Sequence, residues 1–470
     1  MADEQLKAKA HAYVEQVWED IVKDIETLVA IRSVEDMEHA EPGKPYGPAP
    51  FEALQAALDI AERMGLDAHN CEGRIGYADI PGASPKQIAI IGHTDIVPEG
   101  SGWNFDPFRL TRKDGYLIGR GVLDDKGPTV LALYAAQFFA KQAEESKTLN
   151  PYTIRVIIGN NEETEMRDVE WYIENFEQPE FLFTPDANFP LICGEKGGYS
   201  ATVSSGKISD VIVEFDGGTV GNAVAGEAYA IVRAQADQLA ATDRITVEDA
   251  GDGLAKLTAK GIAAHASIPE GSINAIGLLV DYLLENNLCS DEERRFLEFE
   301  KLLFASTDGS TLGIQSADQR LGALTCIGGT IRTKDGVFEQ TIDSRYPESI
   351  SGSQITTIVG YLAQGHGATL ACDLDMVPSY QSPDSAPIQT LVDTYNEYTG
   401  RNGKAYCIGG GTYARHFKCA GAFGPNDPED PMPSWVGAEH SADEGFSEEQ
   451  FKRALEIYIV SLARLMRLEF

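Results

Sequence analysis

Five short motifs hold the acidic and histidine side chains that could do chemistry in this chain. They are G-H-T-D at 92–95, D-D-K-G at 124–127, N-E-E-T at 161–164, P-D-A at 185–187 and A-E-H-S at 438–441. Imidazole and carboxylate groups without thiolates form the ligand set of a two-metal hydrolytic site, most naturally zinc, with cobalt or manganese as substitutes. A metal-bound water ionises near neutral pH, so such a site supports hydrolysis.

The first two motifs place carboxylates where they could bind or support a metal ligand. Residues i and i+2 of an extended segment face the same way, so Asp95 can support a His93 imidazole that turns toward a metal. Taken alone, this motif also fits a polar loop. The adjacent carboxylates of Asp124 and Asp125 repel each other unless a cation or a helix N-terminus neutralises them, and one carboxylate can bridge two metal ions. The other interpretation is that Asp125 caps a helix.

Glu162 and Glu163 follow an apolar run of residues. One of them can bind metal while its neighbour accepts the proton of the metal-bound water and passes it to a leaving amine. The alternative is the acidic start of a helix. Taken alone, Asp186 also fits a turn and His440 an exposed histidine. Five such motifs follow the predicted elements, and this recurrence favours one shared site.

Apolar runs precede three of these motifs and predict an open α/β sheet. The runs are Gln87–Ile91, Tyr152–Ile158 and Phe181–Phe183. Runs this apolar suit strands that are covered on both faces and alternate with helices, which the spacing predicts within residues 1–30 and over 51–64 and 129–142. In open α/β sheets functional groups collect beyond the carboxyl ends of the strands, so we expect the motifs to meet there.

Residues 199–382 have a different pattern and predict a second domain inserted into the first. Half-alternating segments indicate an antiparallel sheet with one solvated face, covered on the other by helices. The predicted helices of this domain are 227–239, 274–287 and 354–364. A helix over 388–398, a strand over 405–408 and a helix over 447–468 then complete the first domain. We therefore expect a catalytic, zinc-binding domain of residues 1–198 and 383–470, and an α+β domain of residues 199–382.

Composition excludes several classes of protein. The chain has 470 residues, 43% hydrophobic, and a formal net charge of -35, which repels nucleic acid and anionic lipid. It has no run of about 18 apolar residues and starts with a polar, acidic stretch, so neither a membrane span nor a secretory signal is expected. Seven scattered cysteines without a CxxC pair indicate reduced thiols. We expect a cytoplasmic globular enzyme.

In their order and spacing, these motifs resemble the co-catalytic zinc metallopeptidase family of carboxypeptidase G, the aminoacylases and the carnosinases. The segments that carry the resemblance are G-H-T-D, G-R-G-V-L-D-D-K-G-P-T, N-E-E-T and P-D-A-N-F-P with E-K-G. Within the family they are most similar to the bacterial dipeptidase V type. The resemblance implies two zinc ions per subunit, one bound by His93, Asp124 and Asp186 and the other by Asp124, Glu163 and His440. It also implies a cis Asp124–Asp125 peptide, Glu162 as general base and Asp95 as the catalytic partner of His93.

The inserted domain also resembles the lid of that family. In A-A-H-A-S-I-P, His265 would polarise the scissile carbonyl and stabilise its oxyanion. The resemblance assigns substrate binding to Asn222, Arg345, Gly410, Gly411 and Thr412. An arginine can hold the C-terminal carboxylate of a peptide through two hydrogen bonds. Taken alone, His265 also fits a packed residue, Arg345 a surface ion pair and the glycine run a turn.

The resulting hypothesis is a dinuclear zinc dipeptidase that hydrolyses short unblocked peptides. A zinc-bridging water or hydroxide would be the nucleophile, with Glu162 as general base and acid. The alternatives are an N-acyl amino acid amidohydrolase or deacylase of the same family and a non-catalytic metal- or peptide-binding protein. The large insertion favours a monomer over a homodimer. Three residues depart from the family pattern, namely Asn161, Ala225 and Asp443, and none of them removes a ligand.

Overall fold

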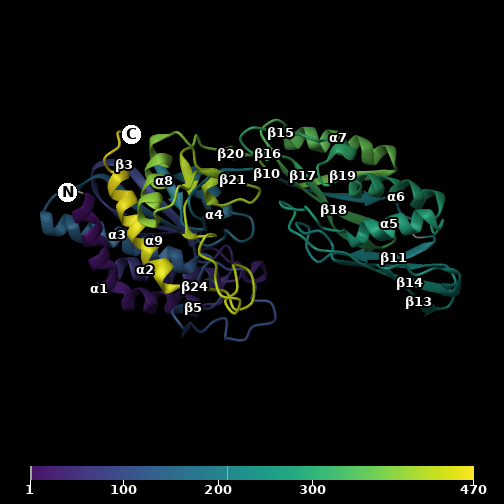
Figure 1. Ribbon diagram of the computed structural model, residues 1–470, viewed down its shortest axis with the longest axis horizontal. Helices are drawn as coiled ribbons and strands as arrows, with labels where there is room; N and C mark the ends of the chain where they lie inside the picture. Colours follow the sequence, from purple (N-terminus) through teal and green to yellow (C-terminus); the bar gives the residue numbers. More distant parts are fainter. Residues whose placement is uncertain (1–2, 209) are drawn as a thin grey trace. The chain divides into compact units, whose positions relative to one another are not determined.

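The computed structural model describes residues 3–208 and 210–470, which form two compact units (Figure 1). Unit 1 comprises Met1–Cys193, Gln381–Tyr406 and Thr412–Phe470, and unit 2 comprises Gly194–Tyr380 and Cys407–Gly411. Among the described residues, no helix is both long and apolar enough to cross a bilayer.

Unit 1 is built on a mixed sheet whose central strands are parallel. The strand order is β1-β2-β6-β3-β7-β22-β9, in which β6, β3, β7 and β22 are parallel and the flanking pairs are antiparallel. The bounds are β1 Asp67–Cys71, β2 Ile75–Ile80, β3 Gly82–His93, β6 Asn150–Gly159, β7 Phe181–Thr184, β9 Ile192–Glu195 and β22 Ala420–Ala422. The apolar end of β3, Ile88–Ile91, is fully buried, as expected for a strand covered on both faces.

Helices flank this sheet, which confirms the predicted α/β class. They are α1 Asp3–Val29, α2 Pro48–Arg63, α3 Lys126–Ser146, α4 Arg167–Asn175, α8 Ala386–Thr399 and α9 Glu448–Leu465. Helices α1, α3 and α9 pack against one another (Figure 1). The shorter elements are η1 Met37–His39, β4 Thr111–Lys113, β5 Tyr116–Ile118, β8 Ala187–Asn188, β21 Tyr406–Ile408, η4 Tyr413–His416, β23 Pro425–Asn426 and β24 Gly445–Ser447.

Unit 2 is an antiparallel sheet with helices packed on it. The strand order is β13-β14-β12-β11-β17-β18-β10-β19. The bounds are β10 Gly197–Ser205, β11 Ile212–Gly217, β12 Glu227–Val232, β13 Ile245–Gly251, β14 Leu254–Lys260, β17 Thr325–Lys334, β18 Val337–Tyr346 and β19 Ala368–Met376. The other elements are η2 Ala236–Gln238, α5 Ala275–Glu285, α6 Asp291–Phe304, η3 Ser310–Leu312, β15 Ala317–Asp318, β16 Gly322–Ala323, α7 Gly352–Gly365 and β20 Ser379–Tyr380.

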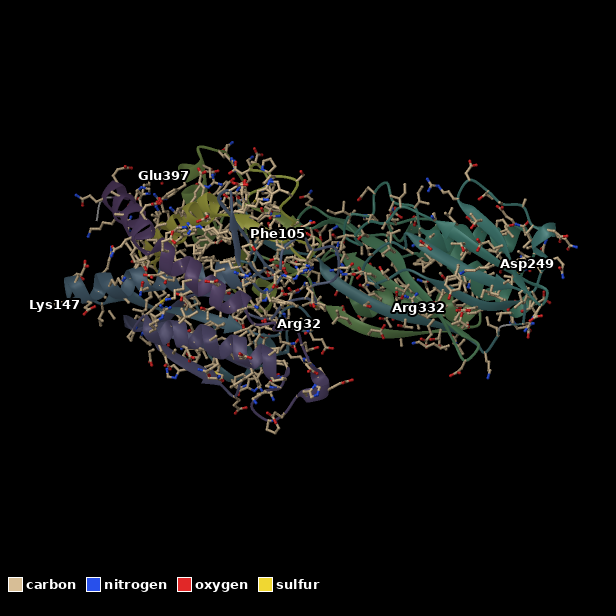
Figure 2. The ribbon with its side chains drawn as sticks, turned by 90° about the horizontal axis from the view of Figure 1, so that it is seen from below. Arg32, Phe105, Lys147, Asp249, Arg332 and Glu397 are labelled. Atoms are coloured by element: carbon tan, nitrogen blue, oxygen red, sulfur yellow. The ribbon has the colours of Figure 1, made fainter. Side chains whose placement is uncertain are left out.

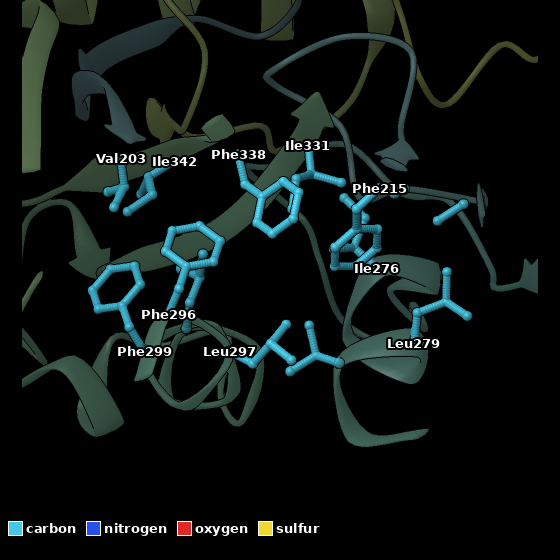
Figure 3. Close-up of a cluster of buried hydrophobic side chains, with 14 of the residues drawn as sticks. Val203, Phe215, Ile276, Leu279, Phe296, Leu297, Phe299, Ile331, Phe338 and Ile342 are labelled. Carbon is cyan, nitrogen blue, oxygen red and sulfur yellow. The ribbon is translucent and has the colours of Figure 1, made fainter. Parts of the chain in front are cut away.

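The core of unit 2 lies between its sheet and its helices. Phe215 and Phe338 of the sheet face Phe296 of α6 and Ile276 of α5 (Figure 3). The rings of Phe296 and Phe338 are 6.0 Å apart, a distance typical of interacting aromatic pairs. This packing agrees with the α+β architecture predicted for the inserted domain.

One predicted helix of this domain is wrong. Residues 227–239 are rich in helix formers, but they form strand β12 followed by the 3-10 turn η2. Strand β12 pairs with β11 and β14, and its residues Ala228, Ala230 and Val232 point into the core with a period of two. Tertiary pairing therefore overrides local propensity here. Helix α6, which was not predicted, begins with a capping box of Ser290 and Glu293.

Glu300 of α6 is fully buried, and neither of its carboxylate oxygens has a hydrogen-bond partner among the described residues. Burial raises the pKa of Glu300 well above its usual 4.5. The folded state therefore retains a proton that the unfolded state releases above pH 4.5, so this group lowers stability progressively as the pH rises.

We expect Glu300→Gln to stabilise the protein above pH 5, because the amide keeps the size of the side chain and cannot ionise. The melting temperature of the variant should exceed that of the wild type by about 2 °C or more at pH 8, with little difference at pH 4. Thermal unfolding from pH 4 to pH 8 measures this difference. Glu298→Gln, at an exposed site on the same helix, is the control. A difference that does not change with pH would contradict the prediction.

Candidate metal centre

The five acidic or histidine motifs of the sequence all lie in unit 1, next to the ends of its elements. His93 is the last residue of β3, and Asp124 lies two residues before α3. Glu162 and Glu163 follow β6, and Asp186 follows β7. His440 lies in the loop between β23 and β24. The carboxyl ends of parallel strands thus supply much of this cluster.

Asp124 lies between the two histidines. Its Oδ1 is 3.1 Å from Nε2 of His93, and its Oδ2 is 2.8 Å from Nε2 of His440. Nε2 of His93 is also 3.7 Å from Asp186, and Nε2 of His440 is 3.1 Å from Glu163. Each oxygen of one carboxylate therefore faces a different imidazole, and each imidazole has a second carboxylate beside it. This arrangement suits two cations bridged by Asp124.

The ligand atoms fit metal ions on chemical grounds as well. The sets His93, Asp124, Glu163 and His93, Glu162, Asp186 each place their ligand atoms within 4.8 Å of one another. Among the described residues, no hydrogen bond reaches Nε2 of His93, Oδ1 of Asp124 or Oε1 of Glu163. Buried polar atoms rarely lack hydrogen-bond partners, and the residues that carry these three atoms lie close together. The cluster therefore has the donor atoms of a zinc-type centre.

The charges of the cluster favour a cation. Burial, followed by the negative charge of Asp186, raises the pKa of Glu162 well above its usual value. Burial and the charge of Asp124 raise the pKa of Glu163 to about 7. Hydrogen bonds to Asp124 and Glu163 raise the pKa of His440 to about 11. The carboxylates thus create a strongly negative potential, which divalent cations would neutralise.

Two further carboxylates support the ligands. Nδ1 of His93 donates to the backbone carbonyl of Asp95 at 3.1 Å, and the carboxylate of Asp95 accepts the backbone N–H of Glu163 at 3.1 Å through Oδ2. Asp125 is the first residue before α3, but its Oδ2 accepts the backbone N–H of His93 at 3.0 Å and the hydroxyl of Thr129 at 3.1 Å, with no side-chain cap on the helix. The Asp124–Asp125 peptide is cis, as the resemblance implies.

The turn that carries Glu162 and Glu163 is held by Asp168, which the sequence analysis missed. The buried carboxylate of Asp168 accepts the backbone N–H groups of Asn160 at 2.8 Å and Asn161 at 3.0 Å. It also accepts the hydroxyl of Tyr413, whose ring meets that of His93 edge-on. The only signal in the sequence was an acidic residue in the first turn of α4, and that position alone does not reveal partners on other elements.

Two departures from the family pattern have a structural reason. Asp443, found where asparagine was expected, accepts three N–H groups, from the backbone and side chain of Asn104 and from the backbone of Phe105. A carboxylate satisfies this all-donor environment fully. Asn161, found where aspartate was expected, donates its amide to Glu35 at 2.8 Å and to Thr164 at 2.6 Å. Nothing in the structure explains Ala225.

Asn161→Asp should disturb the Glu162–Glu163 turn, because it would place a carboxylate oxygen 2.8 Å from the carboxylate of Glu35. We expect kcat/KM to fall by about tenfold, the lower end of the effect of changing a partner that supports a metal ligand. Adding Glu35→Gln places an amide donor opposite the new carboxylate of residue 161 and should recover most of the loss in kcat/KM. Steady-state kinetics of both single variants and the double variant test this coupling, and additive losses would contradict it.

The predicted substrate-binding residues lie in unit 2, except for Thr412, whose hydroxyl accepts the backbone N–H of Ala414 and so caps η4. Asn222 and His265 are on neighbouring segments, because the backbone N–H of Ala266 donates to the carbonyl of Asn222 at 2.9 Å. Gly410 and Gly411 belong to the short segment Cys407–Gly411 of this unit. The joint action of these residues and the metal ligands stays a prediction.

Arg345 and His265 have defined local partners. The guanidinium of Arg345 donates to both oxygens of Asp343, at 2.8 and 3.0 Å, and to the carbonyl of Gly409 at 3.3 Å. Nδ1 of His265 lies 3.2 Å from the backbone N–H of Ser267 and 2.7 Å from its hydroxyl. Because a backbone N–H only donates, Nδ1 accepts and the proton lies on Nε2. Desolvation and the charge of Arg345 lower the pKa of His265, which favours this neutral form.

Comparison with known proteins places the chain in a family of hydrolases. Residues 89–464 match Peptidase family M20/M25/M40, and the chain belongs to this family. It is thus an enzyme that hydrolyses peptide bonds.

The chain also resembles individual proteins over nearly its whole length. It is 31% identical over 466 residues to YtjP of Bacillus subtilis (strain 168), which is provisionally named a dipeptidase, with 96% of this chain and 98% of that protein covered. The fold is similar to that of human carnosine dipeptidase 1, with a TM-score of 0.62, 15% identity and coverage of 98% and 99%. It is also similar to the di-peptidase Dug1p of Saccharomyces cerevisiae, with a TM-score of 0.62, 12% identity and full coverage of both chains.

Proposed function

We propose that the protein is a dinuclear metal-dependent dipeptidase, with zinc as the preferred metal, that cleaves unblocked dipeptides. The observation that carries this proposal is the position of Asp124, whose two oxygens lie 3.1 and 2.8 Å from the Nε2 atoms of His93 and His440. One bridging carboxylate between two imidazoles serves two metal ions better than one. The dipeptidase names of the relatives support the choice of substrate.

The metal ligands would be His93, Asp124 and Asp186 for one ion and Asp124, Glu163 and His440 for the other. When bound, zinc supplies a Lewis acid for the substrate carbonyl and lowers the pKa of water. The backbone carbonyl of Asp95 orients His93 by accepting a hydrogen bond from Nδ1, which leaves Nε2 to bind the metal.

Glu162 would serve as the base and then as the acid. Its partly buried carboxylate, with a raised pKa, would accept a proton from the attacking water and return it to the leaving amine. His265 would donate its Nε2 proton to the oxygen of the reacting carbonyl. Arg345, held in position by Asp343, would bind the C-terminal carboxylate of the dipeptide together with the segment of Gly410, Gly411 and Thr412, and Asn222 would contact the substrate.

The test is hydrolysis of a panel of free dipeptides, tripeptides and N-acetylated amino acids by the zinc-loaded protein, with a chelator control. We expect cleavage of the dipeptides alone and its loss after chelation, with recovery on adding zinc back. Cleavage of only the N-acetylated compounds would overturn the dipeptidase proposal and make the protein an amidohydrolase of the same family. Activity that resists chelation despite complete metal removal would overturn the metal mechanism.

A further inference from the structure

Glu444 is a buried carboxylate that none of the functions above uses. It is fully buried, with 0% of its surface exposed, and Arg120 beside it is 1% exposed. Oε1 of Glu444 accepts three backbone N–H groups, from Gly121 at 3.0 Å, Leu123 at 3.0 Å and Asp124 at 3.2 Å. Oε2 accepts Nη1 of Arg120. One carboxylate thus binds the whole segment that leads to Asp124.

The backbone of Glu444 holds the same segment. Its carbonyl accepts the N–H of Gly119 at 2.9 Å, so the main chain and side chain of one residue together bind residues 119–124. A negatively charged oxygen binds three converging N–H groups more strongly than a neutral carbonyl does. Residues 119–124 precede α3 and belong to none of the helices or strands, so Glu444 is their principal fixed support.

The loop that carries Glu444 also carries His440, and it is closed on itself. The backbone N–H of Gly437 donates to the carbonyl of Asp443 at 2.8 Å, and that of Gly445 donates to Gly437 at 3.2 Å. A side chain on Gly437 would lie 2.1 Å from the carbonyl of Ala442, so only glycine fits. Asp443 fixes the loop to the backbone of Phe105, a residue labelled in Figure 2. His440 and Glu444 therefore lie on one hydrogen-bonded loop.

We propose that Glu444 is a positioning residue that sets the distance between the bridging carboxylate of Asp124 and the ligand His440. It does so through the main chain of residues 121–124 and without contact to metal or substrate. The charge is required as well as the shape, because a glutamine amide at this position would direct N–H groups at the guanidinium of Arg120. This inference rests on the proposed dinuclear centre.

The test compares wild type, Glu444→Gln and Glu444→Gln/Arg120→Gln in the full-length protein. In the double variant, two neutral amides can hydrogen-bond to each other while the side-chain carbonyl at position 444 still accepts the three N–H groups. We expect the single variant to bind the zinc that Asp124, Glu163 and His440 ligate about 10-fold to 100-fold more weakly, and the double variant to recover part of this loss. Zinc titration against a competing chelator measures both dissociation constants.

Hydrogen exchange in the metal-free proteins provides a reading that is independent of catalysis. The amides of Gly121, Leu123 and Asp124 should be protected in the wild type and should exchange faster in Glu444→Gln. Glu448→Gln is the matched control, because Glu448 also pairs with an arginine, Arg112, in unit 1, and within the described residues no hydrogen bond joins its side chain to residues 119–124. It should change neither zinc binding nor the exchange of these three amides.

Each outcome is decisive. A folded Glu444→Gln with wild-type zinc affinities and wild-type amide exchange would overturn the inference. If that variant does not fold, the metal-free wild type decides, because exchange of the three amides as fast as that of the exposed Gly100 would overturn it. A wild-type protein that binds fewer than two zinc ions would instead overturn the proposed dinuclear centre.

Discussion

Glu162→Gln should keep both metal ions and lose about 10²- to 10⁴-fold in kcat, the usual contribution of a general base. The amide keeps the shape of the side chain but cannot accept the proton of the attacking water. Because the proposed ligand sets use Glu163 and not Glu162, zinc content should stay at the wild-type level. Measuring kcat and bound zinc on the same preparation separates these two effects.

The matching variant Glu163→Gln provides the contrast, since it removes a ligand and should reduce zinc content as well as activity. Glu165→Gln, an exposed position in the same turn, should leave both unchanged. Glu162 lies close enough to His93 and Asp186 to act as a ligand itself. A loss of zinc from Glu162→Gln would therefore assign it that role, and wild-type turnover would exclude it as the base.

His265→Ala should lower kcat by about 10²- to 10³-fold, the effect of removing one donor to a developing oxyanion. The hydrogen bonds from Ser267 to Nδ1 leave the proton on Nε2, where it can be donated. Zinc content should not change, because His265 is not among the proposed ligands.

The kinetic pattern distinguishes this role from simple binding. We expect the loss in kcat, with a smaller change in KM, because the oxyanion forms only in the transition state. His366→Ala, a histidine at the end of α7 in the same unit, is the control and should retain full activity. A wild-type rate for His265→Ala would leave His265 with a packing role alone.

The sequence predicted the elements whose signal is local. The buried run Ile88–Ile91 shows its own apolar character, and helix 354–364 corresponds to α7, which begins with a capping box of Ser351 and Gln354. The alanines of strand β12 have high helix propensity, so the local sequence predicts a helix there, whereas its pairing with β11 and β14 decides its conformation. Local signals do not contain that pairing.

In the candidate site, too, some residues can be inferred from local sequence and others cannot. Ligand types such as His93 and Asp124 can be inferred from motifs, because metal chemistry restricts which residues can serve. Asp168 and Glu444 could not be inferred, since each acts by accepting backbone N–H groups of a distant or separate segment. Any sequence provides such N–H groups, so the pattern of residues does not show which carboxylate will accept them.

The division of the chain also determines how the protein can be dissected. Unit 2 includes Cys407–Gly411, a segment with unit 1 residues on both sides. Lys196 donates its N–H to the carbonyl of Ile408 at 2.9 Å, and Arg345 donates to that of Gly409. A fragment of residues 194–380 would therefore lack both of these main-chain acceptors. To obtain unit 2 by itself, residues 407–411 must be joined to residues 194–380 by a linker or added as a separate peptide.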